Sequence, residues 1–147
     1  MWNYFNPVEI IFGENRFKEV HDALKNKNYI IITHPEEIFK KYSDELKSSS
    51  NPPLSIMTDV QPNPDYKDIL ELQKKFSSIN ESVDYILAIG GGSVTDTAKA
   101  IAAFKDKQEY LTDFVRNKKS PRVENPIKII AIPTTSGTSS ELTCWAT

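Results

Sequence analysis

The chain has 147 residues, of which 39% are hydrophobic and 26% are charged, and its formal net charge is −2 at pH 7. This length suits one domain with its own core. The mild negative charge gives no electrostatic reason to expect a nucleic acid or an anionic membrane surface as a partner. Cys144 is the only cysteine, which excludes an internal disulfide framework and suits a reducing compartment.

The N-terminal stretch MWNYFNPVEI carries no basic region followed by an apolar run, so it does not resemble a signal peptide. No stretch of the sequence approaches the roughly 20 apolar residues of a membrane span. We therefore expect a cytoplasmic protein that has no membrane partner.

The first part of the chain alternates short apolar runs with segments of helical spacing. Residues 9–13 (EIIFG) predict a short strand, and residues 15–26 predict a helix. The β-branched run at 28–33 (NYIIIT) is typical of a strand buried on both faces. Residues 34–50 place a proline near a helix start and acids in the first turn, which predicts a second helix. A short strand follows at 54–58.

The same alternation continues to the end of the chain. A helix is expected at 66–78, a strand at 84–90 (DYILAIG) and a helix at 93–104 (SVTDTAKAIAAF). A short helix at 110–117 and a buried strand at 127–133 follow. Strands that alternate with helices of this length predict an α/β domain with a Rossmann-like parallel sheet and helices on both faces.

Three consecutive glycines, Gly90 to Gly92, separate a predicted strand from the next helix. Glycines let the backbone turn sharply and leave its N–H groups open to an approaching anion. We expect Ser93 to be the helix N-cap, with Asp96 completing a capping box. Such a helix start offers N–H donors and a positive dipole end to a phosphate. The alternative is a tight strand–helix turn that needs glycine only for its conformation.

This glycine loop matches neither of the common nucleotide fingerprints. Thr95 stands where G-x-G-x-x-G has its third glycine, and the Walker pattern is absent. The loop also follows the third or fourth predicted strand, whereas the Rossmann fingerprint lies at the first strand–helix turn. The sequence therefore predicts a different kind of phosphate loop.

A second chemically unusual loop, PTTSGTSSELT at residues 133–143, follows the last predicted strand. Its Ser and Thr hydroxyls both donate and accept hydrogen bonds, so they suit ribose hydroxyls, an amide or phosphate oxygens. The alternative is a polar surface loop whose hydroxyls bond to their own backbone. The two loops together are more specific than either one alone.

The pair AIGGGSVTDTAKAIA and IPTTSGTSSELT resembles the iron-containing (group III) alcohol dehydrogenase family, whose members show GGGSxxDxAKA and PTTxGTxSEVT. FNPVEIIFGENRFKEV and VQPNPDY resemble the same family in matching order, so the resemblance extends over nearly the whole chain. It implies that residues 1–147 form the N-terminal dinucleotide-binding domain, with the fold of dehydroquinate synthase. The ending TCWAT resembles the subset that acts on phosphonoacetaldehyde.

The resemblance implies that this domain binds NAD or NADP. The implied cofactor-binding residues lie in the two loops and in the PNP motif: Asn63, Gly91, Gly92, Ser93, Thr134, Thr135, Thr138 and Thr143. The glycine-loop residues would contact the pyrophosphate. Thr134, Thr135 and Thr138 would line the cofactor groove, and Asn63 would lie beside it. Asp96 and Lys99 also match the motif, and we assign them to helix capping and to surface or interface contacts.

The chain departs from the family pattern at three positions. NAD-dependent members often carry Asp after the strand YIIIT, where this chain has His34, a neutral or cationic donor that also permits NADP(H). The alternative is a solvent-facing histidine before a helix proline. Val94 and Ser139 stand where members often have Pro and Gly, so both loop conformations are expected to differ slightly.

The family holds its catalytic metal with one Asp and three His from a helical C-terminal domain. This chain contains only His21 and His34, without ligand-like spacing. We therefore expect Fe or Zn only in a full-length parent enzyme, and neither metal ligands nor catalytic residues in this chain. On this basis the chain by itself is expected to be inactive.

The expected activity of the parent is hydride transfer between a nicotinamide cofactor and a small alcohol or aldehyde, in a homo-oligomer. The alternatives are a stand-alone nucleotide-binding module and a dehydroquinate synthase-like lyase domain. A face that packs on a second domain would be exposed in this chain and would favour association.

Overall fold

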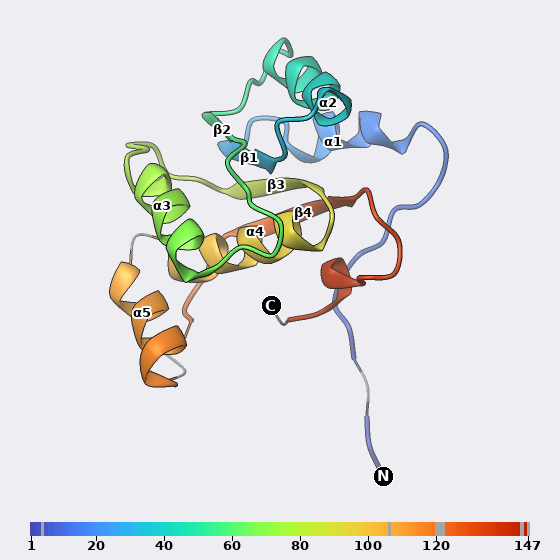
Figure 1. The fold of residues 1–147 in the computed structure, drawn as a ribbon. Coiled ribbons are helices and arrows are strands. Elements are labelled where there is room, and N and C mark those ends of the chain that lie inside the picture. Colours follow the sequence, from blue (N-terminus) through green and yellow to red (C-terminus); the bar gives the residue numbers. More distant parts are fainter. Residues whose placement is uncertain (4, 106, 120–122, 145, 147) are drawn as a thin grey trace.

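The centre of the molecule is a four-stranded parallel sheet (Figure 1). The computed structural model describes residues 1–147 apart from 4, 106, 120–122, 145 and 147. The strands are β1 (Tyr29–Thr33), β2 (Ser55–Met57), β3 (Tyr85–Gly90) and β4 (Lys128–Pro133), and they lie in the order β2-β1-β3-β4. Four of the predicted strands and their parallel arrangement are therefore confirmed.

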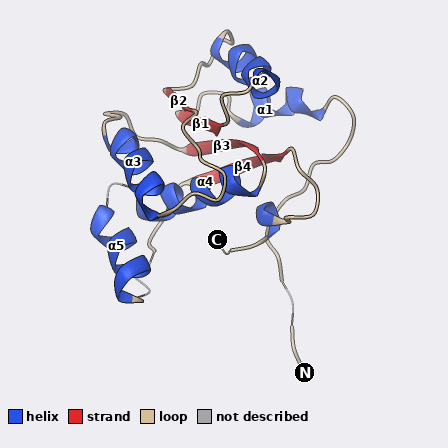
Figure 2. Cartoon of the chain, viewed as in Figure 1, coloured by secondary structure: helices blue, strands red, loops and turns tan. Residues whose placement is uncertain are grey.

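Helices cover both faces of this sheet (Figure 2). They are α1 (Glu19–Ala23), α2 (Glu37–Lys47), α3 (Tyr66–Ser77), α4 (Gly92–Phe104) and α5 (Gln108–Asn117), together with the short 3-10 helices η1 (Arg16–Lys18) and η2 (Ser140–Leu142). α1 and α2 pack on one face, and α3, α4 and α5 lie on the other. The predicted α/β architecture is confirmed.

The sheet separates two apolar cores because successive strand residues point to opposite faces. Ile30 and Ile32 of β1 pack with α3, α4 and α5, whereas Tyr29 and Ile31 pack with α1 and α2. All five residues of β1 are buried, as its β-branched sequence predicts for a central strand. The prediction that the last strand is buried is wrong, because β4 forms one edge of the sheet and is only partly buried.

The predicted strand at 9–13 is wrong. These residues run as an extended segment that pairs with no strand in the described part of the chain. Ile10 and Phe12 are 69% and 93% exposed, so the apolar pattern does not mark a buried position here. The N-terminal segment instead passes beside η2, where the Asn6 side-chain amide donates to the Leu142 carbonyl at 3.1 Å (Figure 1).

The predicted helix at 15–26 is shorter than its apolar spacing suggests. It consists of η1 followed by α1 and ends at Ala23. Asn15 and Asn26, which bracket this segment, both adopt left-handed backbone angles, with φ of 58° at each. Left-handed residues interrupt a right-handed helix, and Asn tolerates them better than most residues do.

A capping box starts α3 directly after the PNP motif. The Asp65 carboxylate accepts hydrogen bonds from the N–H groups of Lys67 at 2.7 Å and Asp68 at 3.1 Å, and the Asp68 carboxylate accepts from the Asp65 N–H at 2.9 Å. The backbone N–H of Asp68, followed by that of Lys67, lowers the pKa of Asp65 from its ordinary 3.8. The box thus defines where α3 begins.

The described helices contain no segment whose length and apolar character would let it cross a bilayer.

Candidate functional site

The two chemically unusual loops lie side by side at the carboxyl edge of the sheet. The Gly90 and Pro133 ends of β3 and β4 are partners in the strand register. The Thr134 N–H then donates to the Gly90 carbonyl at 3.0 Å, which extends the pairing by one bond beyond the strands. Ligands of open parallel sheets bind outside this edge.

Glycines 91 and 92 let the two loops pack closely. A Cβ at Gly91 would lie 2.9 Å from the Thr135 hydroxyl oxygen and 3.1 Å from its methyl group. A Cβ at Gly92 would lie 3.3 Å from the Thr138 methyl group. The glycines therefore have a second role besides the open backbone that the sequence predicts. Because they lack side chains, the two loops can pack against each other.

The start of α4 differs from its prediction. The N-cap is Gly91, in an extended conformation and without any side-chain capping bond, and Ser93 already lies inside the helix. The Ser93 hydroxyl oxygen instead accepts from the backbone N–H of Asn63 at 3.1 Å. The expectation that Ser93 caps α4 is therefore wrong, because a tertiary contact occupies its side chain. The first N–H groups of α4 keep no capping partner from a side chain, which leaves donors of the kind that an anion could bind.

The PNP motif contributes Asn63 to this site. Asn63 has a left-handed backbone with φ of 49°, which turns its N–H toward Ser93. Asn63 is exposed and directly precedes the capped start of α3. The structure therefore brings the predicted residue Asn63 beside the glycine loop.

A cleft of about 430 Å³ opens next to Ser93, over the ends of β1 and β2. Its walls come from the segments that follow these two strands: His34, Pro35, Glu36, Thr58, Asp59, Val60, Gln61, Pro62 and Ser93. His34 is half-buried, with its ring centroid 5.6 Å from that of Phe39. The predicted residues His34 and Ser93 thus border one cavity.

The second loop, residues 133–143, which we call the hydroxyl loop, presents most of its predicted residues to solvent. Thr134, Thr135 and Thr138 are exposed beside the glycine loop. Thr143 lies elsewhere in the loop, where its hydroxyl contacts the Lys99 ammonium at 3.2 Å. Of the four threonines, three therefore border the start of α4, and Thr143 belongs to a polar cluster behind it.

That polar cluster joins α4 to η2. The Lys99 ammonium lies 3.1 Å from the Asp96 carboxylate and 3.1 Å from the Ser140 hydroxyl, and the Ser140 hydroxyl also donates to Asp96. Asp96 and Ser140 are 8% and 6% exposed. The motif positions suggest that Asp96 caps the helix and that Lys99 lies on the surface. In the structure Asp96 is not a helix cap, and Lys99 is not simply a surface residue. A buried carboxylate needs such partners to offset its desolvation.

Sequence reasoning missed Ser140, Glu36 and Asp59 as site residues. Ser140 was one of many hydroxyls in its loop, and only the fold distinguishes the one that reaches Asp96. Glu36 and Asp59 lie within three residues of the ends of β1 and β2, so their position near strand ends was an available signal.

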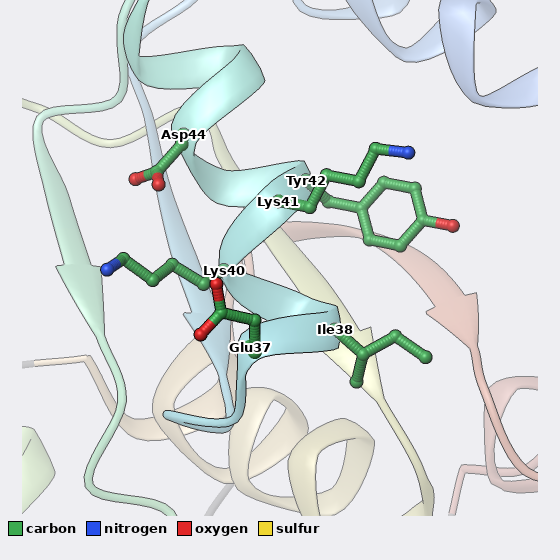
Figure 3. A pocket seen from close by; sticks show the side chains of 6 residues that line it. All are labelled: Glu37, Ile38, Lys40, Lys41, Tyr42 and Asp44. Carbon is green, nitrogen blue, oxygen red and sulfur yellow. The ribbon is translucent and has the colours of Figure 1, made fainter.

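A wider depression of about 640 Å³ lies on α2, lined by Glu37, Ile38, Lys40, Lys41, Tyr42 and Asp44 (Figure 3). All six residues belong to one helix, and they project in two groups, with Glu37, Lys40 and Asp44 on one side of α2 and Ile38, Lys41 and Tyr42 on the other (Figure 3). No group of side chains converges on a ligand there, so the cleft beside Ser93 is the better candidate site.

The described residues do not fit a metal centre. Among them, no three His, Cys, Asp or Glu side chains are grouped so that they could hold an ion. His21 belongs to α1 and lies 3.2 Å from the Glu45 carboxylate of α2, and it does not line the cleft that His34 borders. We therefore derive no chemical step through a metal from these residues.

Comparison with known proteins finds relatives of this chain among alcohol dehydrogenases and aldehyde reductases. The sequence model of the family described as "Iron-containing alcohol dehydrogenase" matches residues 7–147. Alcohol dehydrogenase 4 of Schizosaccharomyces pombe is 32% identical over 152 aligned positions, which cover 97% of this chain and 34% of that protein. Lactaldehyde reductase of Escherichia coli is 31% identical over 139 positions, covering 90% of this chain and 36% of the reductase.

Solved structures agree with these relatives. Sulfoacetaldehyde reductase from Bifidobacterium kashiwanohense in complex with NAD+ superposes with a TM-score of 0.83 and 28% identity, over 98% of this chain and 39% of that one. An iron-containing alcohol dehydrogenase from Thermotoga maritima gives a TM-score of 0.74 and 26% identity, over 97% and 40% of the two chains. The chain thus spans little more than a third of the length of these proteins.

Proposed function

The chain belongs to the iron-containing alcohol dehydrogenase family, and from that premise we propose that residues 1–147 are the NAD(P)-binding domain of a metal-dependent alcohol dehydrogenase or aldehyde reductase. The cofactor would carry the hydride that such an enzyme exchanges with a small alcohol or aldehyde. The metal, Fe or Zn, would be held by residues of the parent enzyme outside the described part of this chain.

The observation that carries the proposal is the start of α4 at the carboxyl edge of the sheet. The N-cap of this helix is Gly91, so no side chain of the cap bonds to the first N–H groups of the helix. These donors, with the positive end of the helix dipole, suit the pyrophosphate of a dinucleotide. The exposed side chains of Thr135 and Thr138 lie next to Gly91 and Gly92, and exposed Thr134 bonds through its N–H to Gly90. Threonine hydroxyls can bond phosphate or ribose oxygens.

We propose that the adenosine half of the cofactor binds in the cleft beside Ser93. It extends from the glycine loop across the ends of β1 and β2, where nucleotides bind in open α/β sheets. Pro35, Val60, Pro62 and His34 are among the residues that line it. In our proposal the nicotinamide ring lies toward the hydroxyl loop.

The substrate of the parent enzyme is proposed to be a short aldehyde or its alcohol. The ending TCWAT, part of which lies outside the described residues, resembles members that act on phosphonoacetaldehyde. The solved structure with a TM-score of 0.83 is a sulfoacetaldehyde reductase. Both aldehydes carry an anionic group, which makes an anionic aldehyde the first substrate to test.

Cofactor binding can be tested on the 147-residue chain itself by calorimetric titration with NADH and NADPH. We expect saturable binding of at least one cofactor, and weaker binding by Ser93→Ala, which removes the hydroxyl between the glycine loop and Asn63. Ser48→Ala, at the exposed end of α2, is the matched control and should bind like the original chain. Absence of saturable binding of both cofactors would overturn the proposal.

A second measurement separates the dehydrogenase from the alternatives. A coding region that continues beyond Thr147 with one Asp and three His of the family would support the dehydrogenase. A stand-alone nucleotide module would bind cofactor without such a region, and a lyase would act on its substrate without net reduction of NAD+. We expect no alcohol-dependent reduction of NAD(P)+ by the 147-residue chain with added Fe²⁺ or Zn²⁺, and turnover would contradict this expectation.

A further inference from the structure

We propose that Glu36 makes this site select NAD(H) over NADP(H). This inference rests on the proposed function and deepens it, since it concerns which dinucleotide the cleft accepts. The two cofactors differ by a phosphate on the adenosine ribose, so the charge of the cleft wall around that ribose decides between them.

The cleft places Glu36 where that ribose is expected. Ser93 of the glycine loop and Glu36 after β1 border the same cavity of about 430 Å³. With the pyrophosphate at the start of α4, the adenosine ribose lies over the carboxyl end of β1. In dinucleotide-binding α/β folds an acidic side chain in this region accepts a hydrogen bond from the ribose 2′-hydroxyl.

Glu36 also controls the nearest alternative phosphate site. It is the N-cap of α2, a helix of 11 residues, and its side chain makes no capping bond to that helix. The positive end of the α2 dipole would otherwise attract a 2′-phosphate. Glu36 brings a negative charge to this end of the helix, and its carboxylate, which makes no capping bond, can accept from a hydroxyl while it repels a phosphate.

The other charges of the cleft do not compensate for Glu36. None of the nine described residues that line the cavity is Lys or Arg, and its one histidine, His34, is cationic only when it is protonated. Asp59 lines it as well and forms an ion pair with Lys75 from α3. Lys75 therefore offsets Asp59, and the wall keeps the unbalanced charge of Glu36. A 2′-phosphate adds a charge of about −1.5 to −2 at neutral pH, which this wall disfavours.

The test compares dissociation constants of NADH and NADPH for the 147-residue chain and its variants at one pH and low salt. We expect the original chain to bind NADH more tightly. Glu36→Gln should reduce the NADPH-to-NADH ratio of dissociation constants about two- to fivefold, the range of one exposed charge interaction. Glu36→Lys should reduce it about tenfold or more. Asp59→Asn, which frees Lys75, should also shift the ratio toward NADPH.

Glu37→Gln is the matched control, since it removes the same charge one residue further along α2, on the depression outside the cleft. It should leave the ratio unchanged, and a higher salt concentration should reduce the preference of the original chain. Thermal unfolding of each variant confirms that it is folded.

Three outcomes would overturn the inference. Tighter binding of NADPH by the original chain contradicts it directly. An equal shift by Glu36→Gln and Glu37→Gln would assign the preference to overall charge. An unchanged NADPH-to-NADH ratio of dissociation constants in Glu36→Gln and Glu36→Lys would show that Glu36 does not determine the cofactor preference. In these cases the proposed function stands, whereas failure of both cofactors to bind would overturn the inference and the proposed function together.

Discussion

The Ser140 hydroxyl donates a hydrogen bond to the Asp96 carboxylate and thereby connects the loop after β4 to the helix after β3. Both side chains are buried, and Lys99 bonds to both of them. The contact holds η2 against α4, and the hydroxyl loop that leads into η2 carries Thr135 and Thr138 toward the glycine loop. It therefore links the packing of the domain to the shape of the proposed cofactor site.

Removal of the Ser140 hydroxyl should destabilise the fold. Ser140→Ala leaves a buried carboxylate with one fewer donor, which costs about 1–3 kcal/mol in the free energy of unfolding. Urea unfolding followed by circular dichroism measures this loss. Ser139→Ala is the matched control, because Ser139 is exposed and its side chain makes no capping bond to η2. Equal losses in both variants would show that the contact with Asp96 contributes nothing.

A methyl group at Gly91 should separate the two loops. Gly91→Ala brings the new Cβ within 2.9 Å of the Thr135 hydroxyl oxygen, and such overpacking costs about 1–3 kcal/mol. The double variant with Thr135→Ala should recover part of this loss, which a double-mutant cycle of unfolding free energies detects. If the single-variant losses simply add, the two loops do not meet as the structure shows.

An acidic side chain at position 34 should strengthen the preference for NADH. His34→Asp adds a carboxylate to the cleft wall, which can accept from a 2′-hydroxyl and repels a 2′-phosphate. We expect the NADPH-to-NADH ratio of dissociation constants to rise about two- to fivefold. Asn125→Asp adds the same charge ahead of β4, at the opposite edge of the sheet, and is the control. An unchanged ratio in His34→Asp would leave the histidine as a solvent-facing residue.

The α3 cap should make stability depend on pH in the acid range. Backbone N–H groups lower the pKa of Asp65 below 3.8, so the ionised cap stabilises the fold above that pH. This contribution is lost as the pH falls through the lowered pKa of the native state. The difference in unfolding free energy between the original chain and Asp65→Asn should therefore shrink from pH about 7 to pH about 2. Asp44→Asn, which removes an exposed carboxylate that caps no helix, is the matched control.

The strands of this domain could be predicted from sequence because each is a short apolar run between helical segments. Placement of the two polar loops at one edge followed from the parallel order of these strands. Residues 9–13 show the limit of this reasoning, since their apolar run contains no information about a pairing partner. Such a strand depends on a neighbour that the local sequence does not identify.

Individual roles within the site were harder to predict than its location. Ser93 has the chemistry of a helix cap, and only the approach of Asn63 from another segment assigns its hydroxyl elsewhere. Asp96 has capping spacing, and its real partner, Ser140, lies 44 residues away in the sequence. Helix-capping rules describe local competition for N–H groups, so a tertiary partner overrides them without any local signal.

The bond from the Thr134 N–H to the Gly90 carbonyl is the last rung between β3 and β4 before the two loops diverge. Thr134 is exposed, so this one bond is what separates its amide hydrogen from exchange with the solvent. Its exchange rate therefore reports whether the loops are locally open or closed. A bound dinucleotide that holds the two loops together should slow hydrogen–deuterium exchange at the Thr134 amide. This measurement detects cofactor binding without enzymatic turnover.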